Sequence, residues 1–164
     1  MTIGLMYGFD RLVKKMDRIA ENIDEEVIIQ VGETIYAPKN ARYFRFASKE
    51  DMDMLYERSR IVVCHAGVGS ILIALEHKKP VIAVPRRKKY EEHIDDHQLD
   101  IAGELEKEGL ITVVHDVEAL DGSLKNSSNV SRIMLGSRNI LAKKLKEYVY
   151  ELEKVHDKKN LKKL

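Results

Sequence analysis

Short apolar runs alternate with stretches of helical spacing along most of the chain. The apolar runs predict strands at residues 2–3, 26–31, 41–46, 60–65, 80–84 and 111–114. Apolar residues recur every three or four positions in residues 9–23, which predicts a helix, and further helices are predicted over residues 48–58, 70–77 and 96–107. This order predicts an α/β fold, a Rossmann-like parallel sheet of about six strands with helices on both faces.

Local signals support these element ends and divide the chain into two parts. Ser48 is followed three residues later by Asp51, a pattern typical of a capped helix start, and Gly109 ends the last predicted helix. Residues 1–125 are expected to form one domain, and residues 126–164 a polar loop and an amphipathic C-terminal helix that packs on the domain or on a partner. The apolar stripe of that helix consists of Leu141, Leu145, Tyr148, Leu152 and Val155.

Composition narrows the class of protein. The 164 residues carry a formal net charge of +1, which argues against nucleic acid as a partner. The single cysteine, Cys64, excludes an internal disulfide, and its place in an apolar strand is typical of an inert core residue. No apolar run approaches the roughly 18 residues of a membrane-spanning helix, and no signal peptide is evident. We therefore expect a soluble, cytoplasmic domain.

A glycine loop is the most informative local feature. The strand predicted to end at His65 runs through Gly67 and Gly69 directly into a helical pattern at Ser70. Such a turn directs free backbone N–H groups and a helix N-terminus at one point, which is where phosphate groups bind. The sequence is neither the dinucleotide fingerprint nor the Walker loop. The glycines can also serve a tight turn alone, with Ser70 as helix cap and His65 bonded to a carbonyl.

A second polar cluster follows the strand predicted at residues 80–84. Four basic and four acidic residues in segment 85–98 are typical of a solvated loop with internal ion pairs. Its last polar residues, Asp96, His97 and Gln98, lie at a predicted helix start, where they can receive sugar hydroxyls. His93 and His97 have the spacing of two metal ligands, but a third ligand is missing, so no metal is predicted. No nucleophile–base pair is visible.

Three ordered motifs closely resemble the C-terminal, donor-binding half of MurG-type glycosyltransferases. They are H-A-G-V-G-S at 65–70, K-P-V-I-A-V-P at 79–85 and E-H-I-D-D-H-Q-L-D-I-A at 92–102. The chain is most similar to two stand-alone versions of that half. One is the soluble subunit of the enzyme that adds the second N-acetylglucosamine to dolichol-linked sugar, and the other is the PssE-type subunit of exopolysaccharide glycosyltransferases. Gly4, Phe9-Asp10-Arg11-Leu12 and Gln30-Val31-Gly32 extend the resemblance over about residues 1–114.

The resemblance implies one half of a GT-B fold, with a UDP-sugar site and neither cofactor nor metal. The diphosphate would lie against His65, Gly67, Gly69, Ser70 and Arg86. The uracil would face main-chain atoms near Phe46 and Ala47, and the donor sugar would face Asp96, His97 and Gln98. Two positions depart from the family pattern. Ile73 replaces a glutamate that binds the ribose hydroxyls, and Leu5 replaces a threonine.

A complete enzyme of this type needs a second half to hold the acceptor. The resemblance implies a donor-binding subunit that works with a membrane-anchored partner at the inner face of the membrane. The partner would supply the polyprenyl-linked acceptor for an inverting transfer of a hexose or N-acetylhexosamine. The general base would come from the partner or from the joined interface. A stand-alone nucleotide- or anion-binding module and a non-catalytic scaffold for the partner are the alternatives.

Overall fold

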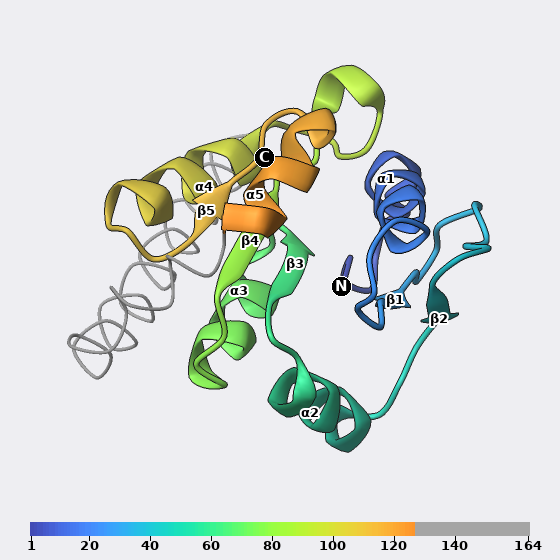
Figure 1. The fold of residues 1–164 in the computed structure, drawn as a ribbon. Coiled ribbons are helices and arrows are strands. Elements are labelled where there is room, and N and C mark those ends of the chain that lie inside the picture. Colours follow the sequence, from blue (N-terminus) through green and yellow to red (C-terminus); the bar gives the residue numbers. More distant parts are fainter. Residues whose placement is uncertain (127–164) are drawn as a thin grey trace.

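A parallel β-sheet forms the centre of residues 1–126, the part of the chain that the computed structural model describes (Figure 1). Its strands are β1 (Ile28–Gln30), β2 (Arg42–Phe44), β3 (Val62–His65), β4 (Val81–Val84) and β5 (Thr112–Val113). All strand pairs are parallel. Thr2 forms bridges to Gln30 on one side and to Cys64 on the other, which gives the order β2-β1-Thr2-β3-β4-β5. The predicted first strand is thus a single bridging residue at the centre of the sheet.

Helices cover both faces of the sheet, as predicted. Helix α1 (Asp10–Ala20), the 3-10 turn η2 (Val117–Ala119) and α5 (Leu120–Asn126) contribute to one buried cluster. Helices α2 (Lys49–Arg58), α3 (Val68–Glu76) and α4 (His97–Lys107) contribute to the other. Strand β3 alternates between them, since Val63 belongs to the first cluster and Val62 and Cys64 belong to the second. A strand buried on both faces does not alternate between apolar and polar residues, which explains the apolar run that precedes His65.

The helix-end signals in the sequence are confirmed in two places. The Ser48 hydroxyl accepts a hydrogen bond from the Asp51 N–H at 3.1 Å and caps α2. Gly109 adopts a φ of +70° just after α4, a conformation that favours glycine. The sequence did not predict η2 or α5. The predicted C-terminal helix lies outside the described residues, and none of the helices in residues 1–126 is long and apolar enough to cross a bilayer.

Asp17 fixes the loop that leads into β2. Its side chain is almost fully buried, and its carboxylate accepts hydrogen bonds from the backbone N–H groups of Lys39, Asn40 and Ala41 at 2.8 to 3.0 Å. The Tyr36 hydroxyl donates a further bond at 2.7 Å. Burial raises the pKa of Asp17, but these hydrogen bonds outweigh it and hold the pKa below its usual 3.8. One charged side chain of α1 therefore anchors the segment that precedes β2.

Candidate functional site

The glycine loop lies at the carboxyl end of β3, where the strand turns directly into α3 (Figure 1). Gly67 is the N-cap of α3, and its N–H donates to the His65 carbonyl at 2.7 Å. No side-chain cap covers the first turn of α3. The alternative in which Ser70 caps this helix is wrong, because the helix begins two residues earlier and places Ser70 inside its first turn. Open first-turn amides at the carboxyl edge of a parallel sheet suit an anion.

The ring of His65 lies beneath this loop and beneath the loop that follows Ile3. A Cβ atom at Gly67 would lie 2.1 Å from His65 Nε2, and one at Gly4 would lie 2.7 Å from Cε1. Only glycine fits at these two positions without moving the ring. At Gly69, by contrast, a Cβ atom meets no heavy atom within 4 Å. The loop is therefore closely packed underneath and open at Gly69.

His65 is neutral at physiological pH. Its side chain is buried, and none of the described residues hydrogen-bonds to its Nδ1. Burial, and after it the positive charge of Arg86, lower the pKa of His65 from 6.5 to about 3. A backbone hydrogen bond with Thr2 opposes this lowering of the pKa, so the structural alternative for His65, a bond to a carbonyl, stays open. Its predicted contact with phosphate stays a prediction.

Arg86 is a buried cation directly behind the site. Only 3% of the residue is exposed, and its Nη2 donates to the carbonyls of Ile3 at 2.7 Å and Tyr7 at 2.6 Å. None of the ion pairs within residues 1–126 includes it. Burial lowers the pKa of Arg86 to about 10, so the guanidinium remains charged at neutral pH. The negative charge of Glu92 opposes this lowering of the pKa without forming an ion pair with Arg86. A buried charge that lacks a direct ion pair is costly unless an anion balances it.

The segment predicted to hold the donor sugar is used in part for internal contacts. Gln98 is buried, and its Oε1 accepts the backbone N–H of Arg86 at 3.1 Å. Asp96 is the N-cap of α4 and accepts the Lys88 N–H at 3.0 Å. His97 begins α4, and its N–H donates to Asp95 at 3.1 Å. The structure therefore brings Gln98 against Arg86, while Asp96 and His97 lie at the helix start beside them.

The residues predicted to face the uracil lie on the other side of the sheet centre. Phe46 and Ala47 follow β2 and are exposed, with Phe46 50% accessible. Both lie after a strand's carboxyl end, at the same edge as the glycine loop. Their exposed main chain is compatible with a planar base, but nothing within residues 1–126 tests that contact.

The metal alternative has no support in the described structure. No group of three or more His, Cys, Asp or Glu side chains within residues 1–126 is placed to hold a metal ion. His93 instead pairs through Nδ1 with Asp95 Oδ1 at 3.0 Å and packs its ring edge-on against Tyr7, with the ring centroids 5.3 Å apart.

The sequence reasoning missed the contacts that hold the site together. Arg11 of α1 donates to both carboxylate oxygens of Glu92 at 2.8 and 2.9 Å and to the Pro85 carbonyl at 3.3 Å. This pair fixes the loop after β4 against α1. Both residues lie within the quoted motifs, yet nothing in their spacing indicates that positions 81 residues apart form an ion pair.

The departures from the family pattern are exposed on this side of the molecule. Ile73 of α3 is 39% exposed, and Leu5 and Met6 in the loop after Ile3 are 66% and 78% exposed. An isoleucine side chain cannot accept hydrogen bonds from ribose hydroxyls.

The family model of the glycosyltransferase family 28 C-terminal domain matches residues 7–155, most of the chain. The chain belongs to this family. The match spans the glycine loop, the loop after β4 and α4, so all three motifs lie inside the family domain.

Curated relatives carry the name UDP-N-acetylglucosamine transferase subunit ALG13. The protein of Eremothecium gossypii is 39% identical over 127 residues, which are 76% of this chain and 61% of that protein. The protein of Mus musculus is 30% identical over 120 residues, which are 66% of this chain and 10% of that protein. The chain thus spans less than two thirds of either relative.

Solved structures confirm the fold. The glycotransferase of kitacinnamycin matches with a TM-score of 0.65 at 15% identity, over 84% of this chain and 37% of that chain. MurG of Acinetobacter baumannii matches with a TM-score of 0.57 at 19% identity, over 84% and 44%. The family 28 domain described here is therefore one Rossmann-like half of a GT-B fold, which confirms the predicted class.

Proposed function

We propose that this family 28 domain is the donor-binding subunit of a heteromeric glycosyltransferase that uses a UDP-sugar. The observation that carries the proposal is the buried Arg86 guanidinium, which forms no ion pair within the described chain and lies close enough to His65 of the glycine loop to lower the pKa of its ring. Diphosphate is the anion that would balance this charge while it accepts hydrogen bonds from the first turn of α3.

Three kinds of hydrogen-bond donor in this site could bind the diphosphate. Backbone N–H groups of the first α3 turn point to it, the Ser70 hydroxyl lies in the same turn, and the neutral His65 ring lies below the loop. Arg86 adds a fixed positive charge at longer range, because its Nη2 already holds the carbonyls of Ile3 and Tyr7. Such prearranged dipoles stabilise charge without rearranging during the reaction.

The proposed reaction is an inverting transfer. An acceptor hydroxyl oxygen attacks the anomeric carbon and forms the new C–O bond, while the bond from that carbon to the diphosphate oxygen breaks. UDP leaves with the bonding electron pair, and the acceptor proton passes to a base. No nucleophile–base pair was found in the sequence, so the base belongs to the partner or to the joined interface. The chain's own contribution is to bind the donor and to stabilise the departing diphosphate.

The partner would be a membrane-anchored, acceptor-binding half. The curated relatives are named as subunits, which supports an enzyme of more than one chain. The sequence resemblance supports a polyprenyl-linked acceptor held by that partner. In this arrangement the chain is cytoplasmic and reaches the inner face of the membrane through the partner.

The donor sugar is proposed to be a hexose or N-acetylhexosamine held near the start of α4. Asp96 and His97 lie at this helix start and are at least partly exposed to solvent. Gln98 is held in place by its hydrogen bond to the Arg86 N–H. The printed names of the relatives make UDP-N-acetylglucosamine the first donor to test.

Calorimetric titration of the purified chain with UDP-N-acetylglucosamine, UDP and pyrophosphate tests the proposal. We expect saturable binding of the first two, lost in Gly67→Val and kept in Gly103→Ala, whose helix position has open space around it. Absence of UDP binding by the folded chain would contradict the proposal. Circular dichroism of Gly67→Val separates loss of binding from loss of the fold.

The exposed Ile73 favours one alternative, an anion- or nucleotide-binding module without a transferase role. Such a module would bind UDP-N-acetylglucosamine no more tightly than UDP, because the sugar would add no contacts, and a pure anion site would bind pyrophosphate equally well. A donor subunit would bind the sugar nucleotide more tightly. The same titration therefore discriminates between the two functions.

A further inference from the structure

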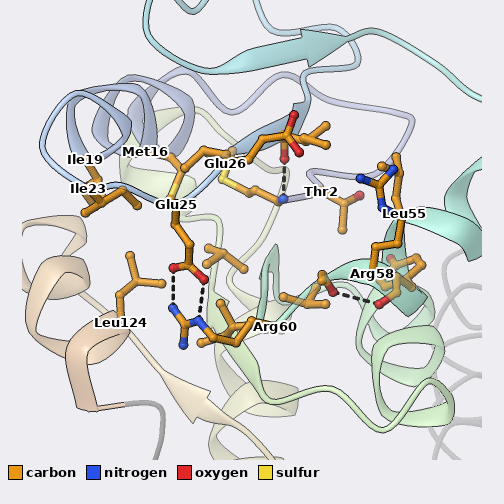
Figure 2. A pocket seen from close by; sticks show the side chains of 18 of the residues that line it. Thr2, Met16, Ile19, Ile23, Glu25, Glu26, Leu55, Arg58, Arg60 and Leu124 are labelled. Carbon is orange, nitrogen blue, oxygen red and sulfur yellow. Dashed lines mark hydrogen bonds and ion pairs between the residues drawn. The ribbon is translucent and has the colours of Figure 1, made fainter.

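Two Arg–Glu ion pairs of the same geometry lie at opposite edges of the sheet. In each pair, the arginine donates from Nε and Nη2 to the two carboxylate oxygens of the glutamate. Arg60 and Glu25 form the pair at the amino edge, which Figure 2 shows, and both side chains are about half exposed. Arg11 and Glu92 form the pair at the carboxyl edge, and only 20% and 8% of their side chains are exposed. An exposed ion pair contributes little to stability, whereas a shielded pair is costly to break.

The Glu92 carboxylate closes the loop that follows β4. Besides the two donors of Arg11, it accepts the backbone N–H of Arg87 at 3.0 Å. The Glu92 N–H donates in return to the Arg87 carbonyl at 3.3 Å. Between these two residues, Glu91 adopts a φ of +58°, a left-handed conformation that is uncommon for residues other than glycine. The hydrogen bonds of Glu92 therefore hold a turn that the chain would not favour by itself.

The closed loop in turn holds the start of α4. The Lys88 N–H, next along the chain from Arg87, donates to the Asp96 carboxylate at 3.0 Å, and Arg87 Nε lies 3.5 Å from the same oxygen. Asp96 is the N-cap of α4, and His97 is the first residue of that helix. A continuous set of contacts thus runs from α1 through Glu92 and the backbone of the loop to the two residues proposed to face the donor sugar.

Arg11 is itself fixed by several contacts. Its guanidinium carbon lies 5.3 Å from the ring centroid of Phe9 and 4.8 Å from that of Tyr90, within the range of cation–π attraction. Its Nη2 also donates to the Pro85 carbonyl at 3.3 Å. Phe9 is fully buried and directly precedes α1. The position of the guanidinium is therefore tied to the core of the domain.

We propose that Glu92, held by Arg11, is a positioning residue for the donor sugar. This role rests on the proposed function, because the pair would act on the binding of a UDP-sugar. The pair holds the loop that leads to Asp96 and His97, and none of its hydrogen bonds within residues 1–126 reaches the glycine loop. Arg86 is held separately, by carbonyls of another loop. Loss of the pair should therefore weaken binding of the sugar and leave binding of the diphosphate in place.

Two substitutions break the pair in different ways. Glu92→Gln keeps the shape of the side chain but places an amide N–H₂ where a second acceptor oxygen is needed. Arg11→Lys keeps the charge but loses the planar fork that reaches both oxygens. The exposed neighbour Glu91→Gln is the matched control for the lost charge, and Arg60→Lys in the exposed pair is the matched control for the lost fork.

Calorimetric titration of each full-length chain with UDP, UDP-N-acetylglucosamine, UDP-glucose and UDP-galactose measures the contribution of the sugar. That contribution is the ratio of the dissociation constant of UDP to that of the sugar nucleotide that binds most tightly. A loss of folded protein leaves this ratio unchanged, and a change in diphosphate binding largely cancels in it, because both ligands carry the diphosphate. Amide hydrogen exchange of Arg87 and Lys88, measured without ligand, reports how firmly the loop is held.

We expect Glu92→Gln and Arg11→Lys to lower this ratio at least about threefold, while UDP affinity falls by no more than about twofold. The Arg87 and Lys88 amides should exchange at least about tenfold faster in both variants. The two control variants should leave the ratio and the exchange rates unchanged.

An unchanged ratio or unchanged exchange in the variants of the shielded pair, or an equal change in the controls, would overturn the positioning role. Such a result, obtained with a wild-type chain that binds UDP and binds a sugar nucleotide more tightly, would leave the proposed function standing. Absence of UDP binding by the wild-type chain, or equal affinity for UDP and all three sugar nucleotides, would overturn the proposed function and the positioning role together.

Discussion

The His65 ring packs against the backbone of Gly67 at the N-terminus of α3 and occupies the space that a side chain at residue 67 would need. A Cβ atom at residue 67 would lie 2.1 Å from Nε2 of this ring, well inside van der Waals contact. The buried histidine therefore dictates glycine at the turn, and the turn leaves the first amides of α3 open. The packing of the His65 ring and the open amides in the first turn of α3 therefore depend on the same two residues, His65 and Gly67.

Replacing Gly67 by alanine should weaken both folding and UDP binding. The new methyl group must displace the buried ring, and we expect a loss of about 1–3 kcal/mol in the free energy of unfolding. Gly103→Ala is the matched control, since its methyl group meets open space and lies in α4, outside the glycine loop. Chemical denaturation and UDP titration of both variants check the difference. Equal stability of the two would show that the ring does not restrict residue 67.

Removing the ring should restore tolerance at residue 67. In the His65→Ala background, Gly67→Ala no longer meets Nε2, so its additional cost should fall by at least half. A double-mutant cycle in the free energy of unfolding measures this coupling. Additive effects would contradict direct contact between the ring and the turn.

The stability of the protein should fall with decreasing pH because of His65. The pKa of His65 is about 3 in the folded chain, and its usual value of 6.5 applies to the unfolded chain. As the pH falls, the unfolded chain therefore binds this proton before the folded chain does. The contribution of His65 is complete above pH 6.5 and is lost as pH falls toward 3, by roughly 1.4 kcal/mol for each unit at most. Denaturation curves between pH 7 and 4 should show this slope, and His65→Gln should flatten it. An unchanged slope in the variant would contradict the assignment.

Arg86 should contribute more to anion binding through its charge than through its shape. Arg86→Lys keeps a cation behind the glycine loop, whereas Arg86→Met keeps the apolar volume alone. Both lose the paired contact with the Ile3 and Tyr7 carbonyls and should destabilise the fold by about 1–3 kcal/mol. UDP affinity, measured on folded protein, should fall at least about tenfold further in Arg86→Met than in Arg86→Lys. Equal affinities would show that the buried charge does not act on the ligand.

Asp17 should be among the carboxylates that matter most for stability. An asparagine at this position has one acceptor oxygen, whereas the two carboxylate oxygens of Asp17 together accept the backbone N–H groups of the loop. We expect Asp17→Asn to lower the free energy of unfolding by about 2–4 kcal/mol. The pKa of Asp17 lies below 3.8, so its contribution is present above that pH and is lost as pH falls further. Urea denaturation of Asp17→Asn against the exposed control Asp24→Asn measures the effect. Similar losses in the two variants would contradict the anchoring role.

Much of the fold follows from the hydrophobic pattern. Strand β4 is apolar at every position and β3 at every position before His65, because each faces two helical layers, and the sequence shows this directly. The Ser48 cap and the Gly109 terminator are local effects, which is why they were predictable. Helix α5 was missed because its seven residues include a glycine and several polar side chains, and only Leu120 is fully buried.

The site was predictable in its loop but not in its supports. The glycine turn is a local motif and lies where the pattern places it. Arg86 was expected to lie against the diphosphate, but nothing in the sequence indicated that it is buried and bonded to the carbonyls of Ile3 and Tyr7. The Arg11–Glu92 pair likewise joins positions far apart in sequence. Such contacts depend on how the loops meet in three dimensions, which no local pattern encodes.

The location of UDP on the folded chain tests the central claim most directly. Amide chemical shifts of the ¹⁵N-labelled protein, followed during a UDP titration, report which backbone groups contact the ligand. We predict saturable shifts centred on Val68, Gly69 and Ser70, in the first turn of α3. Shifts confined to other parts of the sheet, or none at saturating UDP, would contradict a diphosphate site at the head of this helix.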